Sequence, residues 1–134
     1  MQSGLAAGLT GALVCLGIAW WFGAVAWAPG WPDAGWAWLI NNALLVTLAE
    51  EAFFRGYLQP ALNRRLGGPW ACICTAVLFG LAHYAGGPGL VALASVAGLF
   101  YGWAYQRGGL AAAVVAHLLL NTLHVAFFSY PAVA

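Results

Sequence analysis

Charge is what this sequence has least of. Only 5% of the 134 residues are charged: three are acidic, four are arginines, and none is a lysine. Soluble domains carry about 25% charged residues, and a surface that binds nucleic acid needs clustered basic side chains. The composition therefore excludes an ordinary soluble domain, and it offers nucleic acid no surface to bind.

Cysteine is also scarce. Cys15, Cys72 and Cys74 lie in apolar runs, and no second pair completes a zinc-type spacing. We interpret all three as small, buried hydrophobic side chains. They predict neither a disulfide framework nor a redox compartment.

Apolar residues are what the chain has in abundance, at 64% of the sequence. A membrane crossing takes about 20 such residues, so the length allows about five crossings. We predict a single all-α domain over residues 1–134, a polytopic membrane helix bundle of about five transmembrane helices. Glycine- and proline-rich turns separate the expected helices, which run over residues 5–27, 36–62, 70–84, 90–106 and 110–128.

Small residues recur at every fourth position in two of these helices. This spacing lets neighbouring backbones approach closely in a membrane. We therefore expect packing faces at Gly4, Gly8 and Ala12 in the first helix, and at Ala94, Gly98 and Gly102 in the fourth.

The arginines predict the orientation. Arg64, Arg65 and Arg107 fall in two loops that share one side of the membrane, whereas the other loops carry only Asp33. Loops rich in basic residues stay on the cytoplasmic side. The N-terminus is then cytoplasmic and the C-terminus lies outside.

Two of the three acidic residues, Glu50 and Glu51, are adjacent and lie within a long apolar segment. A charged side chain at the bilayer centre costs at least about 2.5–3.5 kcal/mol, and such residues usually mark functional sites. Glu51 and Arg55 are four residues apart on one helix face and can pair. Glu50 points elsewhere and stays free.

Polar residues on two later helices lie at a matching depth. Counted from the cytoplasmic helix ends at 1.5 Å per residue, Glu50, His83 and Asn121 sit about 20 Å deep, and His117 about 15 Å. His124 lies a further turn along the face of His117 and Asn121. With an apolar core about 30 Å thick, this layer is nearer the outer side.

The residues alone leave several functions open. Hydrogen bonds between helices could explain a lone histidine or asparagine, but two carboxylates are a poor choice for that purpose. A zinc site is an alternative, because two histidines and one glutamate form a common catalytic ligand set. A proton- or ion-coupled small transporter could use the same groups as a relay, although the inverted repeats typical of transporters are absent.

Three motifs carry a resemblance to a known family. Glu-Glu-x-x-x-Arg begins at Glu50, Phe-x-x-x-His ends at His83, and His-x-x-x-Asn joins His117 to Asn121. On successive membrane helices, over about residues 43–124, this order resembles the CPBP family. That family comprises the CAAX prenyl endopeptidases and bacteriocin-processing enzymes, which are glutamate-dependent intramembrane proteases, also called the Abi family.

The resemblance implies a role for each motif residue. Glu50 matches the glutamate that activates water, and His83 matches its histidine partner. His117 and Asn121 match the pair that supports the oxyanion. The implied reaction is hydrolysis of a peptide bond, which needs a base, an acid and oxyanion donors.

Glu51 and Arg55 match the structural acid–base pair of the family. No cofactor is predicted by the resemblance. A divalent metal such as zinc is kept as an alternative, with Glu50, His83 and His117 as the ligands if one is present.

The length of the chain indicates which members of the family it resembles most. It is shorter than the eukaryotic prenyl-protein enzymes and is more similar to small bacterial members associated with protein sorting. These process C-terminal tails that anchor proteins in the membrane. The implied partner is a membrane-anchored protein or peptide, such as a C-terminal sorting tail, within the lipid bilayer. The implied location is a bacterial inner membrane, with the active site nearer the extracytoplasmic side.

Overall fold

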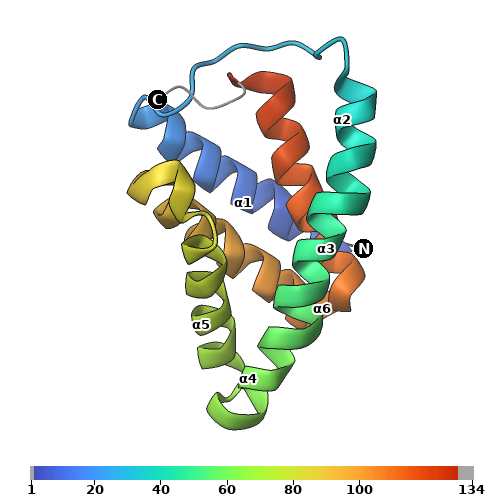
Figure 1. The fold of residues 1–134 in the computed structure, drawn as a ribbon, viewed down its shortest axis with the longest axis vertical. Helices are drawn as coiled ribbons and strands as arrows, with labels where there is room; N and C mark the ends of the chain where they lie inside the picture. The colour runs from blue at the N-terminus through green and yellow to red at the C-terminus, as the bar shows by residue number, and fades with distance from the viewer. Residues whose placement is uncertain (1, 130–134) are drawn as a thin grey trace.

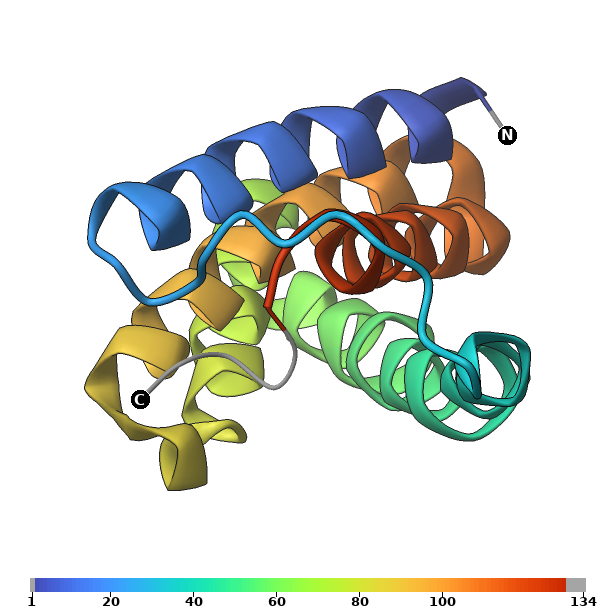
Figure 2. The ribbon, with the colours of Figure 1, turned by 90° about the horizontal axis from the view of Figure 1, so that it is seen from above.

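The structure, a computed structural model, describes residues 2–129, and all regular secondary structure in that range is helical. The chain runs from one helix into a long, continuous helical rod, then into a short helix and a final long helix that bends back (Figures 1 and 2). In order, the elements are α1 (Gln2–Trp21); the rod made of α2 (Gly35–Asn41), η1 (Asn42–Thr47), α3 (Leu48–Glu51), η2 (Ala52–Leu58) and α4 (Gln59–Leu66); α5 (Gly68–Leu81); η3 (Tyr84–Gly86); and α6 (Gly87–Phe127).

A break at Gly109 divides α6 into two limbs. Its backbone is non-helical there, with φ 69° and ψ −166°, a region that glycine enters readily because it has no Cβ. The first limb descends from η3 and the second returns upward beside α1 (Figure 1). The two limbs correspond to the fourth and fifth helices expected from the sequence.

The first helix is shorter than predicted. It ends at Trp21 rather than at residue 27, and Gly23 adopts φ 72° just beyond it. We call residues 22–34 the strap, which crosses to α2 over the end of α6 (Figures 1 and 2). The N–H of Ala28 donates to the carbonyl of Phe127 at 2.9 Å. The exit was not apparent from the sequence, because residues 22–27 are apolar like the helix before them.

The third helix also stops short of the predicted end at residue 84. α5 ends at Leu81, and His83 follows it with φ −96° and ψ 16°, outside any helix. The chain then makes one turn of 3₁₀-helix in η3 before α6 begins. His83 therefore sits on a connection between helices.

The rod contains two π-helical stretches, η1 and η2, on either side of α3. Wider turns of this kind often occur at functional sites. They align residues five apart, and Thr47 accordingly donates its hydroxyl hydrogen to Asn42 Oδ1 at 3.1 Å. The sequence analysis assumed an ordinary helical period and did not predict them.

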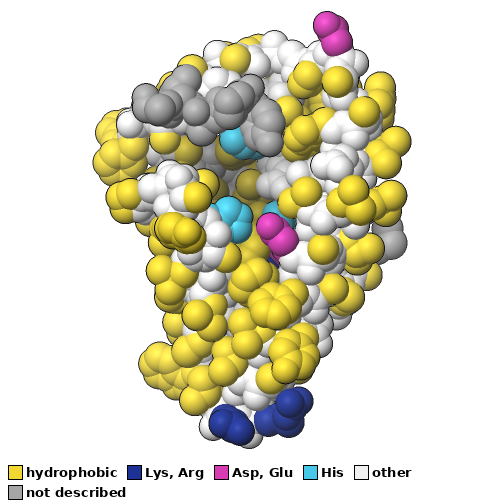
Figure 3. All heavy atoms as spheres, in the orientation of Figure 1, with side chains coloured by type: hydrophobic (Ala, Val, Ile, Leu, Met, Phe, Trp, Pro, Cys, Tyr) yellow, Lys and Arg dark blue, Asp and Glu magenta, His cyan; other side chains and the backbone are white. Residues whose placement is uncertain are grey.

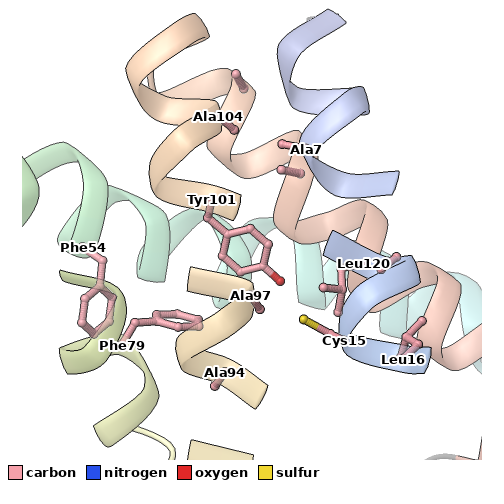
Figure 4. Packing of buried hydrophobic residues seen from close by; sticks show 13 residues of the cluster. Ala7, Cys15, Leu16, Phe54, Phe79, Ala94, Ala97, Tyr101, Ala104 and Leu120 are labelled. Atoms are coloured by element: carbon pink, nitrogen blue, oxygen red, sulfur yellow. The ribbon is translucent and has the colours of Figure 1, made fainter. Parts of the chain in front are cut away.

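The expected small-residue packing is confirmed. A Cβ added at Gly4 would lie 2.7 Å from the carbonyl oxygen of Ala112, so α1 lies directly against the second limb of α6. On the first limb, a Cβ at Gly98 would lie 3.0 Å from Ala76 Cα on α5. Between these contacts lies the apolar core, in which Tyr101 occupies a central place (Figure 4).

Within residues 2–129, two helical segments are long and apolar enough to cross a membrane, judged by length and composition: Gln2–Trp21 and Tyr84–Phe127. The second contains the break at Gly109, and α5 is apolar but shorter. The prediction of five separate spans thus stays a prediction. Large apolar side chains cover the outside, including Leu13 at 78% and Leu45 at 70% exposure, which suits a lipid environment better than water.

Candidate active site

The predicted pairing of Glu51 with Arg55 is confirmed. Arg55 Nη1 donates to Glu51 Oε1 at 2.9 Å, and both side chains are completely buried. Arg55 Nη2 donates to the carbonyl of Gly98 at 2.9 Å, and the guanidinium lies 4.6 Å from the centre of the Phe79 ring. Neutralisation, hydrogen bonding and the aromatic face together offset the cost of burying this charge.

His117 joins the same network, which the sequence analysis did not predict. Its Nδ1 lies 2.8 Å from Glu51 Oε1 and donates to that carboxylate. Tyr101 stacks on the imidazole with ring centres 4.4 Å apart and planes 12° apart. Glu51 and Tyr101 therefore fix the ring orientation, and Nε2 faces Glu50, whose Oε2 is 3.9 Å away. No spacing in the sequence could reveal this contact between α3 and α6.

The four residues predicted to be catalytic line one cavity of about 420 Å³: Glu50, His83, His117 and Asn121. Histidine and acidic side chains gather in a hollow near the middle of the face shown in Figure 3, away from the basic end. The Glu50 side chain is 32% exposed, whereas Glu51 is sealed behind it. The carboxylate that faces the cavity is thus the one that the sequence left unpaired.

His83 and Asn121 are each held by one hydrogen bond. His83 Nδ1 donates to the carbonyl of Phe79 at 2.8 Å, so its Nε2 is left for the cavity. Asn121 Nδ2 donates to Asn42 Oδ1 at 3.2 Å, which leaves Asn121 a second N–H. Asn42 therefore supports Asn121, a role that the sequence analysis did not assign.

The zinc alternative concerns Glu50, His83 and His117. Within residues 2–129, no group of three or more histidine, cysteine, aspartate or glutamate side chains is arranged to hold a metal ion. One nitrogen of His117 is bound to Glu51, and His124, which also lines the cavity, lies 3.1 Å from the carbonyl of Ser129. The zinc alternative stays a hypothesis.

Comparison with known proteins identifies the family. Residues 30–123 match the family model described as type II CAAX prenyl endopeptidase Rce1-like. Neither the curated proteins nor the solved structures gave a match. The matched segment contains all three motifs and the whole helical rod, and it favours a protease over the transporter alternative. This integral membrane protein belongs to the Rce1-like family of type II CAAX prenyl endopeptidases and is a protease.

Proposed function

We propose that the protein is an intramembrane endopeptidase in which Glu50 activates the attacking water. The observation that supports this proposal is the cavity shared by Glu50, His83, His117 and Asn121. Glu50 is the carboxylate open to that cavity, because Glu51 is fully buried and bound to Arg55. A general base must reach both water and the substrate, and of the two adjacent carboxylates Glu50 is the one that meets that requirement.

In the proposed reaction, water attacks the carbonyl carbon of the peptide bond and Glu50 takes its proton. Glu50 passes this proton to Nε2 of His83; the tetrahedral oxyanion then collapses, the C–N bond breaks, and His83 delivers the same proton to the leaving amine. His83 suits this role because its Nδ1 is engaged with Phe79 and its Nε2 is not. Cys15 also lines the cavity, but its thiol lies 3.8 Å from the carbonyl of Leu93 and is not needed as a nucleophile.

His117 and Asn121 supply the oxyanion donors. As an oxyanion donor His117 would use Nε2, which faces the cavity, while its Nδ1 stays with Glu51. Oxyanion donors held in place before the reaction typically contribute about 10²–10³ in rate each.

The family indicates a membrane-associated protein substrate, and we propose more narrowly an apolar C-terminal sorting tail. Apart from its polar residues, much of the cavity wall is apolar, and Glu50 is the one acidic residue that lines it. A segment with charged side chains would leave them unpaired there. An apolar tail that enters from the lipid has no charged side chains to leave unpaired.

The test is cleavage by pure protein in liposomes. Three fluorescence-quenched peptides would be compared: an apolar membrane tail, a farnesylated peptide ending in a CAAX sequence, and a polar soluble peptide. We expect the first to be cleaved fastest, at a rate unchanged by a chelator. Faster cleavage of the farnesylated peptide would replace the proposed substrate class. Absence of any cleavage would overturn the proposed function.

We also infer a bacterial inner-membrane location, a cytoplasmic N-terminus, and a cavity nearer the extracytoplasmic side. Basic side chains collect at the end of the molecule where α4 meets α5 (Figure 3), and exposed Asp33 lies in the strap. Cysteine placed at Asp33, in a variant lacking the native cysteines, should react with an impermeant thiol reagent added to intact cells. Cysteine at exposed Leu66 should react only after the inner face is opened. The reverse pattern would invert the topology.

A further inference from the structure

Tyr101 presents an unused hydroxyl to the cavity. The side chain is only 1% exposed, and its ring is fixed between His117, at a centroid distance of 4.4 Å, and Phe79, at 5.9 Å. Among residues 2–129 the hydroxyl has no hydrogen-bond partner, and its oxygen is not completely buried. Figure 4 shows the oxygen directed toward the side where Cys15 and Leu120 lie.

Much of the cavity wall is apolar. Leu16, Leu93, Ala94, Ala97 and Leu120 are among the residues that line it. A lone hydroxyl in such a wall is costly unless a partner arrives. The motif residues do not explain it, because Tyr101 lies outside all three motifs and contacts His117 only through its ring face.

A membrane substrate supplies such a partner. Backbone carbonyls inside a bilayer are satisfied within a helix, and a cleavable segment must unwind and lose those bonds. The hydroxyl of Tyr101 and the carboxylate of Glu50 belong to residues that both lie beside His117. Because both residues lie beside His117, one extended peptide segment in the cavity can contact both groups.

We propose that the Tyr101 hydroxyl donates a hydrogen bond to a backbone carbonyl of the unwound, apolar substrate segment. It replaces a bond that the substrate gives up on leaving its helix. Tyr101 is thus a positioning residue for the substrate backbone, and it selects an extended segment without reading any side chain. This inference rests on the proposed function, because it assumes that a peptide occupies the cavity.

The direct test is Tyr101→Phe, which removes one oxygen and keeps the ring against His117. With the quenched apolar tail peptide in liposomes, we expect KM to rise about three- to tenfold while kcat changes less than twofold. The pH profile of kcat should stay unchanged. The matched control is Tyr105→Phe, one turn along α6 and lining a separate pocket, which should behave as the unmodified protein does.

A second arm locates the carbonyl. In a series of tail peptides, each carbonyl in turn is replaced by a methylene group. One replacement should raise KM for the unmodified enzyme and add nothing to Tyr101→Phe, as coupled partners do. Equal KM values for both enzymes on every peptide would overturn the inference and leave the proposed function standing. Failure of the unmodified protein to cleave any peptide would overturn both.

Discussion

Glu50 and Glu51 are neighbours in the chain and lie in opposite environments. Glu51 is sealed in a network of Arg55 and His117, with a carbonyl behind the arginine. Glu50 faces a cavity and is about one-third exposed. A helix turns about 100° per residue, so one step along the rod separates the buried, paired carboxylate of Glu51 from the carboxylate of Glu50, which is proposed to react. The two residues are of the same type, so their different environments follow from their positions on the helix.

Glu50→Gln should produce the largest effect and separate the two roles most sharply. The amide keeps the shape of the carboxylate but cannot accept the proton from water. We expect cleavage to fall by about 10²–10⁴-fold, with thermal unfolding in detergent unchanged. Asp33→Asn is the matched control, because it makes the same chemical change at an exposed position in the strap, and it should retain full activity. Near-normal turnover by Glu50→Gln would remove Glu50 from the mechanism.

Glu51→Gln should act on stability first. It leaves Arg55 as an uncompensated buried charge, which costs about 3–5 kcal/mol, and it removes the anion that orients His117. Reversible denaturation in mixed micelles measures the loss. The double variant Glu51→Leu, Arg55→Met restores an uncharged interior and should recover most of the stability without recovering cleavage. If Glu51→Gln were as stable as the unmodified protein, the sealed network would have no structural role.

Gly98→Ala should have the smallest of the three effects. Its added Cβ would lie 3.1 Å from Arg55 Nη2 and 3.0 Å from Ala76 Cα, so the guanidinium must shift away from the Gly98 carbonyl. We expect a loss of about 1–3 kcal/mol, as for other overpacked interiors. Gly17→Ala makes the same change on exposed α1, where nothing lies within 4 Å of the added carbon. Equal stability of the two variants would argue against close packing around Arg55.

Scarcity of charge made part of this site readable from the sequence. With two of three acids adjacent and an arginine one turn later, the pairing of Glu51 with Arg55 followed from helical geometry and is confirmed. Counting residues from the helix ends placed the polar groups at one depth, and Glu50, His83, His117 and Asn121 do line one cavity. Their catalytic roles stay proposals.

Other features depend on contacts that no local pattern records. The hydrogen bond from His117 to Glu51 joins residues 66 positions apart, and the placement of Tyr101 depends on how α6 meets α5. The π-helical stretches were missed because the spacing of Glu51 and Arg55 fits an ordinary helical period. The exit of α1 at Trp21 was missed because apolar residues continue past it to Trp27.

The strap connects the two ends of the described chain. It lies mostly before the segment shared with the family, and the chain that it binds, from Ala126 to Ser129, lies after that segment. Ser129 N–H donates to the carbonyl of Ala26 at 2.8 Å, and the Trp27 ring stacks on Phe127 at 5.6 Å. The segments before and after the family-matched region are thus bound directly to each other. Because these bonds join backbone atoms, deleting either segment would leave amide or carbonyl groups of the other without partners.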